Sequence, residues 1–340
     1  MHTRIDIQEV AAEALAALGT GRQIEPFSAR LSAFGLEDAY RVTAAIRQRR
    51  ETRGETPVGR KIGFTNRTIW AEYNVYEPIW GYVYNRTVHN LSEIDDTFSL
   101  VGLAEPRIEP EIVFKLAAAP APGMDEGALL KGIDWVGHGF EIVQSIFPGW
   151  KFAAPDTVAA FGLHGALLIG PRHSIAAHAE DCGRTLSTFE IDLKRDGVVV
   201  DHGLATNVLG GPLSALRHLI GILARDQVNP PLAAGEIVTT GTLTRALPVS
   251  AGETWMASNQ LRLWFSVFAH LIMSRLQAEI LTGTELANAS IGQVRLRLFK
   301  IAARSKVSVR RIHIELCSAY PLQSLFSLVH KRLGSLVAAT

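Results

Sequence analysis

Residues 105–114 have the alternating pattern of a β-strand, Glu105-Pro106-Arg107-Ile108-Glu109-Pro110-Glu111-Ile112-Val113-Phe114. One face of this strand carries Glu109, Glu111 and Val113, and the other face is apolar. Two carboxylates two residues apart on one face repel each other and resist burial, so a positive charge is expected between them. Hard oxygen ligands suit Mg²⁺ or Mn²⁺ rather than Zn²⁺. The alternative is a solvated edge strand whose two acids have no special role.

The charge of the chain is unevenly distributed. The 340 residues are 47% hydrophobic and carry a net charge of +1, which indicates no polyelectrolyte partner for the chain as a whole. Residues 257–340, however, contain eleven Lys and Arg against three Asp and Glu, whereas the remainder contains 23 against 30. This asymmetry predicts two parts of different origin.

Cysteine content and hydropathy indicate a cytoplasmic protein. Cys182 and Cys317 are the two cysteines, too few for a disulfide framework. Asp6 and Glu9 interrupt the place where a signal peptide would have its apolar core. The longest apolar run, residues 263–273, is too short to cross a bilayer. We therefore expect no membrane partner.

The pattern of elements predicts an α+β fold. Helical spacing is found over the ranges 5–18, 36–53, 126–131, 210–226 and 259–280. Strands are expected into Tyr84, at 166–169 and at 235–244, with a hairpin turning at Asp196-Gly197. The many β-segments and few helices lack a βαβ rhythm, which excludes a doubly wound fold.

Two further polar residues are candidates for a site on the residues alone. Lys61 is bracketed by glycines in residues 59–66 (GRKIGFTN), where it could point into a pocket and hold a carboxylate or be an ordinary solvated lysine. Glu141 is a lone acid in the apolar run 138–146, where a structural cap or a surface residue is the alternative to a functional group.

Three landmarks in order, GRKIGFTN at 59–66, EPRIEPEIVF at 105–114 and FEIVQS at 140–145, resemble the fumarylacetoacetate hydrolase superfamily. They are similar to its hydratase/decarboxylase branch, the 2-oxopent-4-enoate hydratases and oxalocrotonate decarboxylases, as are residues 209–216 and 235–253. The resemblance implies a mixed β-roll core, and it divides the chain into a helical segment (1–85), a metal-binding catalytic β-roll domain (86–256) and a basic helical and β tail (257–340).

The resemblance also implies the site and its chemistry. Glu109, Glu111 and Glu141 would hold Mg²⁺ or Mn²⁺, and Lys61 would lie next to a small 2-oxo or 2-hydroxydienoic acid. The implied reaction is the addition of water to a 2-hydroxy-2,4-dienoate, through its 2-oxo-3-enoate tautomer, to give a 4-hydroxy-2-oxo acid in aromatic catabolism. Decarboxylation of a 2-oxo-enedioate and C–C hydrolysis are the alternatives on the same fold, and a homo-oligomer is implied.

The chain departs from that branch after Ala159. Where the branch has Asp-Asn-Ala-Ser-type residues, this chain has Ala160-Phe161-Gly162-Leu163-His164. His164, and also His138 three residues before Glu141, could serve as an acid or base near neutral pH, the alternative being a histidine bound to a backbone carbonyl. The departure leaves open which of the branch's substrates and reactions applies.

The tail has a resemblance of its own. Residues 257–276 and 291–316 are similar to the C-terminal end of DDE-type insertion-sequence transposases, which implies an enzyme gene fused to part of a mobile element. Glu279, Glu285 and Glu315 are too isolated for an acidic triad, so transposition is not implied. We expect at most weak nucleic-acid binding, through the basic tail. The remaining alternative is an inactive fusion product whose tail binds nucleic acid.

Overall fold

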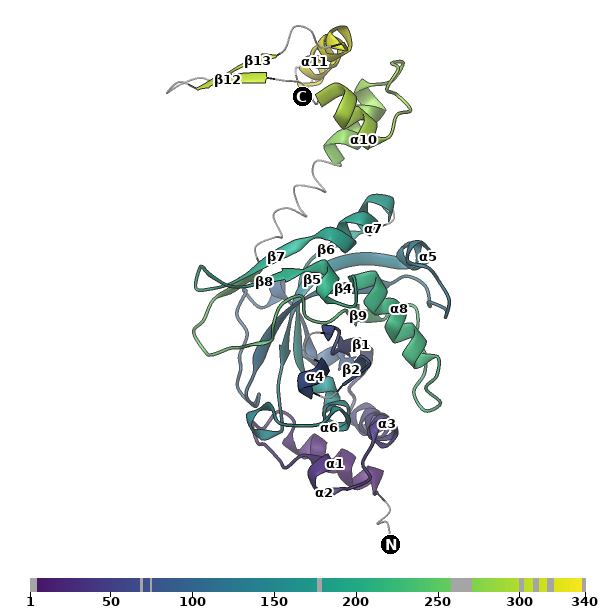
Figure 1. The fold of residues 1–340 in the computed structure, drawn as a ribbon, viewed down its shortest axis with the longest axis vertical. Helices are drawn as coiled ribbons and strands as arrows, with labels where there is room; N and C mark the ends of the chain where they lie inside the picture. The colour runs from purple at the N-terminus through teal and green to yellow at the C-terminus, as the bar shows by residue number, and fades with distance from the viewer. Residues whose placement is uncertain are drawn as a thin grey trace. The chain divides into compact units, whose positions relative to one another are not determined.

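The computed structural model describes residues 5–67, 70–73, 75–175, 179–257, 271–299, 303–307, 312–316 and 321–337. Contacts within the chain divide it into two compact units, 1–260 and 261–340. Each unit is considered by itself (Figure 1). In the described residues, no helix is both long and apolar enough to cross a membrane.

A layer of helices forms the N-terminal end of the first unit. It consists of α1 (Ile7–Ala17), α2 (Phe27–Arg30), α3 (Leu36–Thr52) and α6 (Ala154–Ala159). The Asp6 carboxylate caps α1 by accepting hydrogen bonds from the next turn's backbone. Fully buried alanines on α1 let it approach its neighbours closely. The helices predicted at 5–18 and 36–53 are confirmed.

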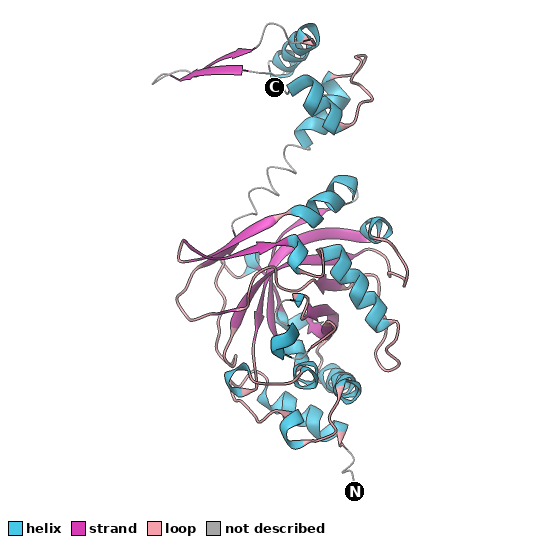
Figure 2. Ribbon diagram, in the orientation of Figure 1, coloured by secondary structure: helices cyan, strands magenta, loops and turns pink. Residues whose placement is uncertain are grey.

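A curled mixed sheet forms the body of the first unit (Figure 2). Its order is β2-β1-β9-β4-β5-β6-β3, and β10 also pairs with β4. The β1–β9 and β3–β6 pairs are parallel and the others are antiparallel. This agrees with the predicted α+β class and mixed β-roll. The strands are β1 (Pro57–Gly63), β2 (Ile79–Tyr84), β3 (Val88–Asn90), β4 (Arg107–Leu116), β5 (Ile133–Val143), β6 (His164–Ser174), β9 (Ile237–Thr239) and β10 (Leu247–Pro248).

Helices cover the apolar face of β4. The short helix α4 (Trp70–Tyr73) follows β1, and α5 (Glu126–Lys131), α7 (Ala179–Thr188) and α8 (Pro212–Leu223) lie further along the chain. Ile112 and Phe114 of β4 share one core with Leu216 and Leu219 of α8. Burial of this face leaves the face with Glu109 and Glu111 for the site.

A second sheet has the order β11-β7-β8. Its strands are β7 (Glu190–Arg195), β8 (Val198–Leu204) and β11 (Trp255–Ala257). The turn between β7 and β8 is Asp196-Gly197, with both residues at positive φ, as the sequence predicted. The short β11 pairs with β7, so the chain forms a strand at the point where the sequence changes character.

The second unit has a small core of its own. It contains α10 (Ile291–Val294), β12 (Ala303–Val307), β13 (Ile312–Leu316) and α11 (Gln323–Val337), with β12 and β13 antiparallel. Leucines and valines of its helical segments bury one another. Part of the helix predicted at 259–280 lies outside the described residues, and 271–280 is helical.

Candidate metal centre

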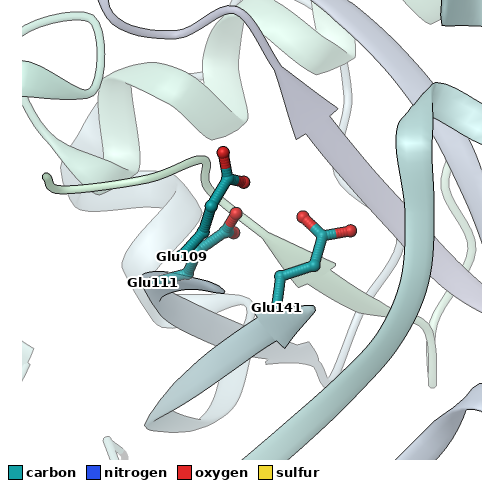
Figure 3. Close-up of side chains that lie close together, drawn as sticks. All are labelled: Glu109, Glu111 and Glu141. Atoms are coloured by element: carbon teal, nitrogen blue, oxygen red, sulfur yellow. The ribbon is translucent and has the colours of Figure 1, made fainter. Parts of the chain in front are cut away.

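Three glutamates converge on one point of the main sheet. Glu109 and Glu111 project from β4, and Glu141 projects from β5, where it is the direct antiparallel partner of Glu109. One carboxylate oxygen from each lies within 4.8 Å of the others. Figure 3 shows the three side chains reaching into the same space from the two strands. Glu111 and Glu141 are buried and Glu109 is partly buried.

Glu141 is held by two cationic or polar side chains. Lys61 of β1 places Nζ 3.0 Å from Glu141 Oε2 and also donates a hydrogen bond of 3.0 Å to the carbonyl of Gly162. His164 of β6 lies with Nδ1 2.7 Å from Glu141 Oε1, and its Nε2 lies 2.8 Å from Thr87 Oγ1. Both ring nitrogens of His164 are therefore engaged inside the protein.

Glu111 is bound on one oxygen. The backbone N–H of Gly241 donates to Glu111 Oε2 over 2.9 Å. Gly241 has φ +89°, and a Cβ at this position would lie 2.0 Å from Thr65 Oγ1. A glycine is needed here, because any side chain would push the backbone away from the carboxylate.

The cluster has more acidic groups than cationic ones. Burial raises the pKa of Glu109 to about 7, and it raises the pKa of Glu111 well above its ordinary value. For Glu141 burial acts in the same direction, but Lys61 and His164 outweigh it and lower the pKa to about 2. Burial disfavours the Lys61 ammonium, yet the three glutamates raise its pKa, so this lysine is a cation at neutral pH.

The donor set fits a divalent cation. Among the described residues, Glu111 Oε1 is buried without a hydrogen-bond partner, whereas Glu141 Oε2 has the Lys61 ammonium 3.0 Å away. A buried carboxylate oxygen without a partner, such as Glu111 Oε1, is costly unless a cation binds it. Three carboxylates against one ammonium leave a formal charge of −2. An all-oxygen set of this charge suits Mg²⁺, Mn²⁺ or Ca²⁺.

A cavity of about 80 Å³ opens beside the cluster. Lys61, Arg107 and Glu109 are its charged wall residues. Its apolar wall residues include Ile79, Val143, Trp150, Phe152 and Leu163. The cavity can therefore hold a small molecule with an apolar chain and a polar end directed at the glutamates.

The structure brings Glu109, Glu111, Glu141 and Lys61 together. His164 contacts Glu141 but does not line the cavity. His138 pairs with Ile112 on the opposite face of β4 and β5, and burial lowers its pKa to about 4. This placement removes His138 as an acid or base for the cluster.

Sequence reasoning missed the residues that support the cluster. Thr87 and Gly241 lie far from the motif in sequence and have no signal of their own. Arg107, by contrast, could have been found, because it lies two residues before Glu109 and so on the same face of the strand.

Two parts of the chain match different proteins. Residues 250–338 match the model of the transposase DDE domain group 1 family. The body is similar to 2-hydroxyhexa-2,4-dienoate hydratase of Comamonas testosteroni, with 30% identity over 242 residues, which is 70% of this chain and 87% of the hydratase. It is also similar to 4-oxalocrotonate decarboxylase of Pseudomonas sp. strain CF600, with 32% identity over 218 residues, 64% of this chain and 78% of the decarboxylase.

A solved structure agrees with these relatives. 4-Oxalocrotonate decarboxylase from Pseudomonas putida G7, complexed with magnesium and adipate, superimposes with a TM-score of 0.65 and 27% identity, covering 76% of this chain and 94% of the decarboxylase. Both resemblances inferred from the sequence are confirmed. Through the unit that carries the glutamate cluster, the chain belongs to the hydratase/decarboxylase branch of the fumarylacetoacetate hydrolase superfamily.

Proposed function

We propose that the first unit is a metal-dependent lyase that adds water to a 2-hydroxy-2,4-dienoate, through its 2-oxo-3-enoate tautomer, to give a 4-hydroxy-2-oxo acid. The observation that carries this proposal is the group of three glutamates beside a small cavity, in which Glu111 Oε1 is buried without a partner among the described residues. Relatives named as dienoate and 2-keto-4-pentenoate hydratases support the substrate class.

Glu109, Glu111 and Glu141 are proposed to hold Mg²⁺ or Mn²⁺. Relatives solved with magnesium and with calcium support a hard divalent ion. When bound, such an ion acts as a Lewis acid that stabilises negative charge on the 2-oxygen of the substrate. Gly241 fixes one oxygen of Glu111, and His164 fixes one oxygen of Glu141, so both carboxylates are oriented before binding.

Lys61 is proposed to hold and protonate the substrate. Its ammonium lies in the cavity wall beside Glu141, and the surrounding carboxylates keep it charged. A charged lysine donates hydrogen bonds to a substrate carboxylate and can deliver a proton when the dienol becomes the enone. His164 is proposed to act through Glu141 rather than on the substrate, because both its ring nitrogens are already engaged.

Decarboxylation is the second candidate. The same stabilised oxygen accepts the electron pair of a breaking C–C bond, and 4-oxalocrotonate decarboxylases are as similar to the chain as the hydratases. C–C hydrolysis is a third use of the same oxygen. We also propose a cytoplasmic homo-oligomer, and at most weak, salt-sensitive nucleic-acid binding through the basic second unit.

The test compares Glu111→Gln with Glu25→Gln, a change at an exposed acid outside the cluster. Each full-length protein is given Mn²⁺ and 2-hydroxypenta-2,4-dienoate, and loss of dienoate absorbance is followed together with formation of the 4-hydroxy-2-oxo acid. We expect turnover by the wild type and Glu25→Gln, and a loss of at least about 100-fold in Glu111→Gln. Release of CO₂ from a 2-oxo-enedioate without hydration would favour the decarboxylase. An inactive fusion product would show neither reaction.

A further inference from the structure

His164 links the glutamate cluster to the edge of the main sheet. Its Nδ1 lies 2.7 Å from Glu141 Oε1, and its Nε2 lies 2.8 Å from Thr87 Oγ1. The imidazole is buried, with 2% of the residue's surface exposed, whereas Thr87 is partly exposed. The contacts from Glu141 through His164 to Thr87 therefore run from the interior of the sheet to its outer edge, on a side where neither His164 nor Thr87 lines the cavity.

The three residues come from neighbouring strands or lie next to them. Glu141 of β5 is paired with Leu167 of β6, and Leu167 is paired with Val88 of β3. Thr87 directly precedes Val88, and β3 is the last strand in the order of the main sheet. Because β3 has three residues and one neighbouring strand in the described sheet, few ladder hydrogen bonds hold it. A side-chain contact at its start therefore adds to its attachment.

The hydrogen bonds of the Thr87 hydroxyl suit either protonation of the imidazole. A carboxylate only accepts, so His164 Nδ1 is the donor to Glu141. If Nε2 carries no proton, the Thr87 hydroxyl donates to it. If Nε2 carries a proton, the hydroxyl accepts from it and donates to the carbonyl of Tyr84, 3.0 Å away. The contact is kept in both cases, so the ring plane that directs Nδ1 at Glu141 is fixed from behind.

We propose that Thr87 is a positioning residue for the metal centre, which holds the His164 ring against Glu141 and so couples metal binding to the attachment of β3. This inference rests on the proposed metal centre and concerns the side of Glu141 away from the cavity. His164 lies in the segment 160–164, in which the chain departs from its branch, so the link is a feature of this chain. The alternative is a threonine that only stabilises the turn Asn85–Thr87.

The coupling has two measurable sides. A metal ligand whose supporting hydrogen bonds are weakened loses more freedom on binding, so loss of the Thr87 hydroxyl lowers the affinity for metal. Coupling between two sites is reciprocal, so metal bound at Glu141 must also oppose the opening of β3 by a similar factor. Opening of an edge strand is measured by hydrogen exchange of its backbone amides.

The test compares Thr87→Val, which has nearly the same shape without the hydroxyl, with Thr87→Ser, which keeps the hydroxyl. Thr20→Val is a matched control, because Thr20 Oγ1 also donates to a carbonyl three residues earlier, that of Ala17, over 2.7 Å. Calorimetry gives the Mn²⁺ affinity of each full-length protein. Hydrogen exchange of residues 88–90 is measured in a chelator and in saturating Mn²⁺, and thermal melts in the chelator control for folding.

We expect Thr87→Val to bind Mn²⁺ about 3- to 10-fold more weakly than the wild type, as for one lost hydrogen bond. Thr87→Ser and Thr20→Val should bind within about twofold of the wild type. Mn²⁺ should slow exchange at residues 88–90 by about 3- to 10-fold in the wild type and leave it unchanged in Thr87→Val. Full affinity in Thr87→Val, or a Thr87→Ser as weak as Thr87→Val, would overturn the proposal. So would an equal effect of Mn²⁺ on this exchange in both proteins.

A double substitution separates this route from a general loss of packing. In a His164→Asn background, Thr87→Val should cost no further Mn²⁺ affinity, because the ring that joins Thr87 to Glu141 is gone. A further loss of the same size would place the effect of Thr87 outside this route and overturn the proposal. A wild type that does not bind Mn²⁺ would refute the proposed metal centre and this inference together, whereas equal binding by the wild type and Thr87→Val would refute the inference alone.

Discussion

Replacing Glu109 by glutamine should stabilise the metal-free chain at pH 8 and at the same time abolish its response to metal. The reason is the cost of holding a charged carboxylate in the cluster. Burial raises the pKa of Glu109 from 4.5 to about 7, so the folded chain disfavours the ionised form that predominates at pH 8. Glutamine resembles the neutral acid in shape and carries no charge.

The size of the effect follows from linkage. A shift from 4.5 to about 7, at about 1.4 kcal/mol per pKa unit, lowers the free energy of unfolding by roughly 3 kcal/mol at pH 8. Because the folded pKa is raised, the folded chain binds the proton more tightly than the unfolded chain does. Stability from this group is therefore present below about pH 4.5 and is lost as pH rises to 7. At pH 5 the cost should be below about 1 kcal/mol.

Thermal melts in a chelator at pH 5 and pH 8 measure this difference, with Glu25→Gln as the control. For a folded unit of this size we expect Glu109→Gln to melt on the order of 5–10 °C above the wild type at pH 8, and only slightly above it at pH 5. Mn²⁺ at a hundred times its dissociation constant should raise the free energy of unfolding of the wild type by about 2.7 kcal/mol. It should leave that of the variant unchanged. Equal melts at pH 8 in the chelator would refute the reasoning, as would a variant that still responds to Mn²⁺.

Three further changes test the surroundings of the cluster. His164→Asn should weaken Mn²⁺ binding by about 10- to 100-fold in calorimetry, because Glu141 loses the imidazole that orients it; unchanged affinity would contradict this. Lys61→Met should bind Mn²⁺ at least as tightly as the wild type, because a competing positive charge is removed. Its dienoate turnover should fall by about 100-fold or more. Retained turnover would exclude a proton-transfer role for Lys61. Truncation after residue 260 should preserve the melting temperature and the Mn²⁺ response of the first unit. Truncation after Thr254 deletes β11 and should lower the melting temperature, because it uncovers the edge of β7. Equal melting temperatures of the two truncated proteins would show that β11 does not stabilise the unit.

The strand pattern was sufficient to predict half of the cluster. Alternation alone puts Glu109 and Glu111 on one face, and burial of the opposite face follows from its apolar residues. Glu141 and Lys61 needed the family resemblance, because a lone acid and a lone lysine carry no pattern of their own. Long-range contacts such as that between His164 and Thr87, 77 residues apart, depend on strand order, which no local pattern encodes.

The departure of residues 160–164 has a structural consequence that the sequence could not indicate. Phe161 and Leu163 both adopt positive φ, and the turn that they form directs the carbonyl of Gly162 at Lys61 Nζ. His164 follows the turn and contacts Glu141. The altered segment therefore contributes Gly162 and Leu163 to the wall of the cavity, and it orients two charged groups, Lys61 and Glu141.

Pro110 explains why the cluster can lie in the middle of a sheet. In an antiparallel ladder the N–H and C=O of one residue point to the same side of the strand. The carbonyl of Pro110 accepts a hydrogen bond from Leu243 N on the side away from β5, so the nitrogen of Pro110 also faces that side. On that side β10 pairs at residues 107–108 and β9 at 113–115, so no strand of the described chain pairs with the residues between them. A proline costs no ladder hydrogen bond at such a gap. The connection that crosses the gap supplies Gly241 to Glu111, so the interruption that admits the proline also brings a backbone donor to the buried carboxylate.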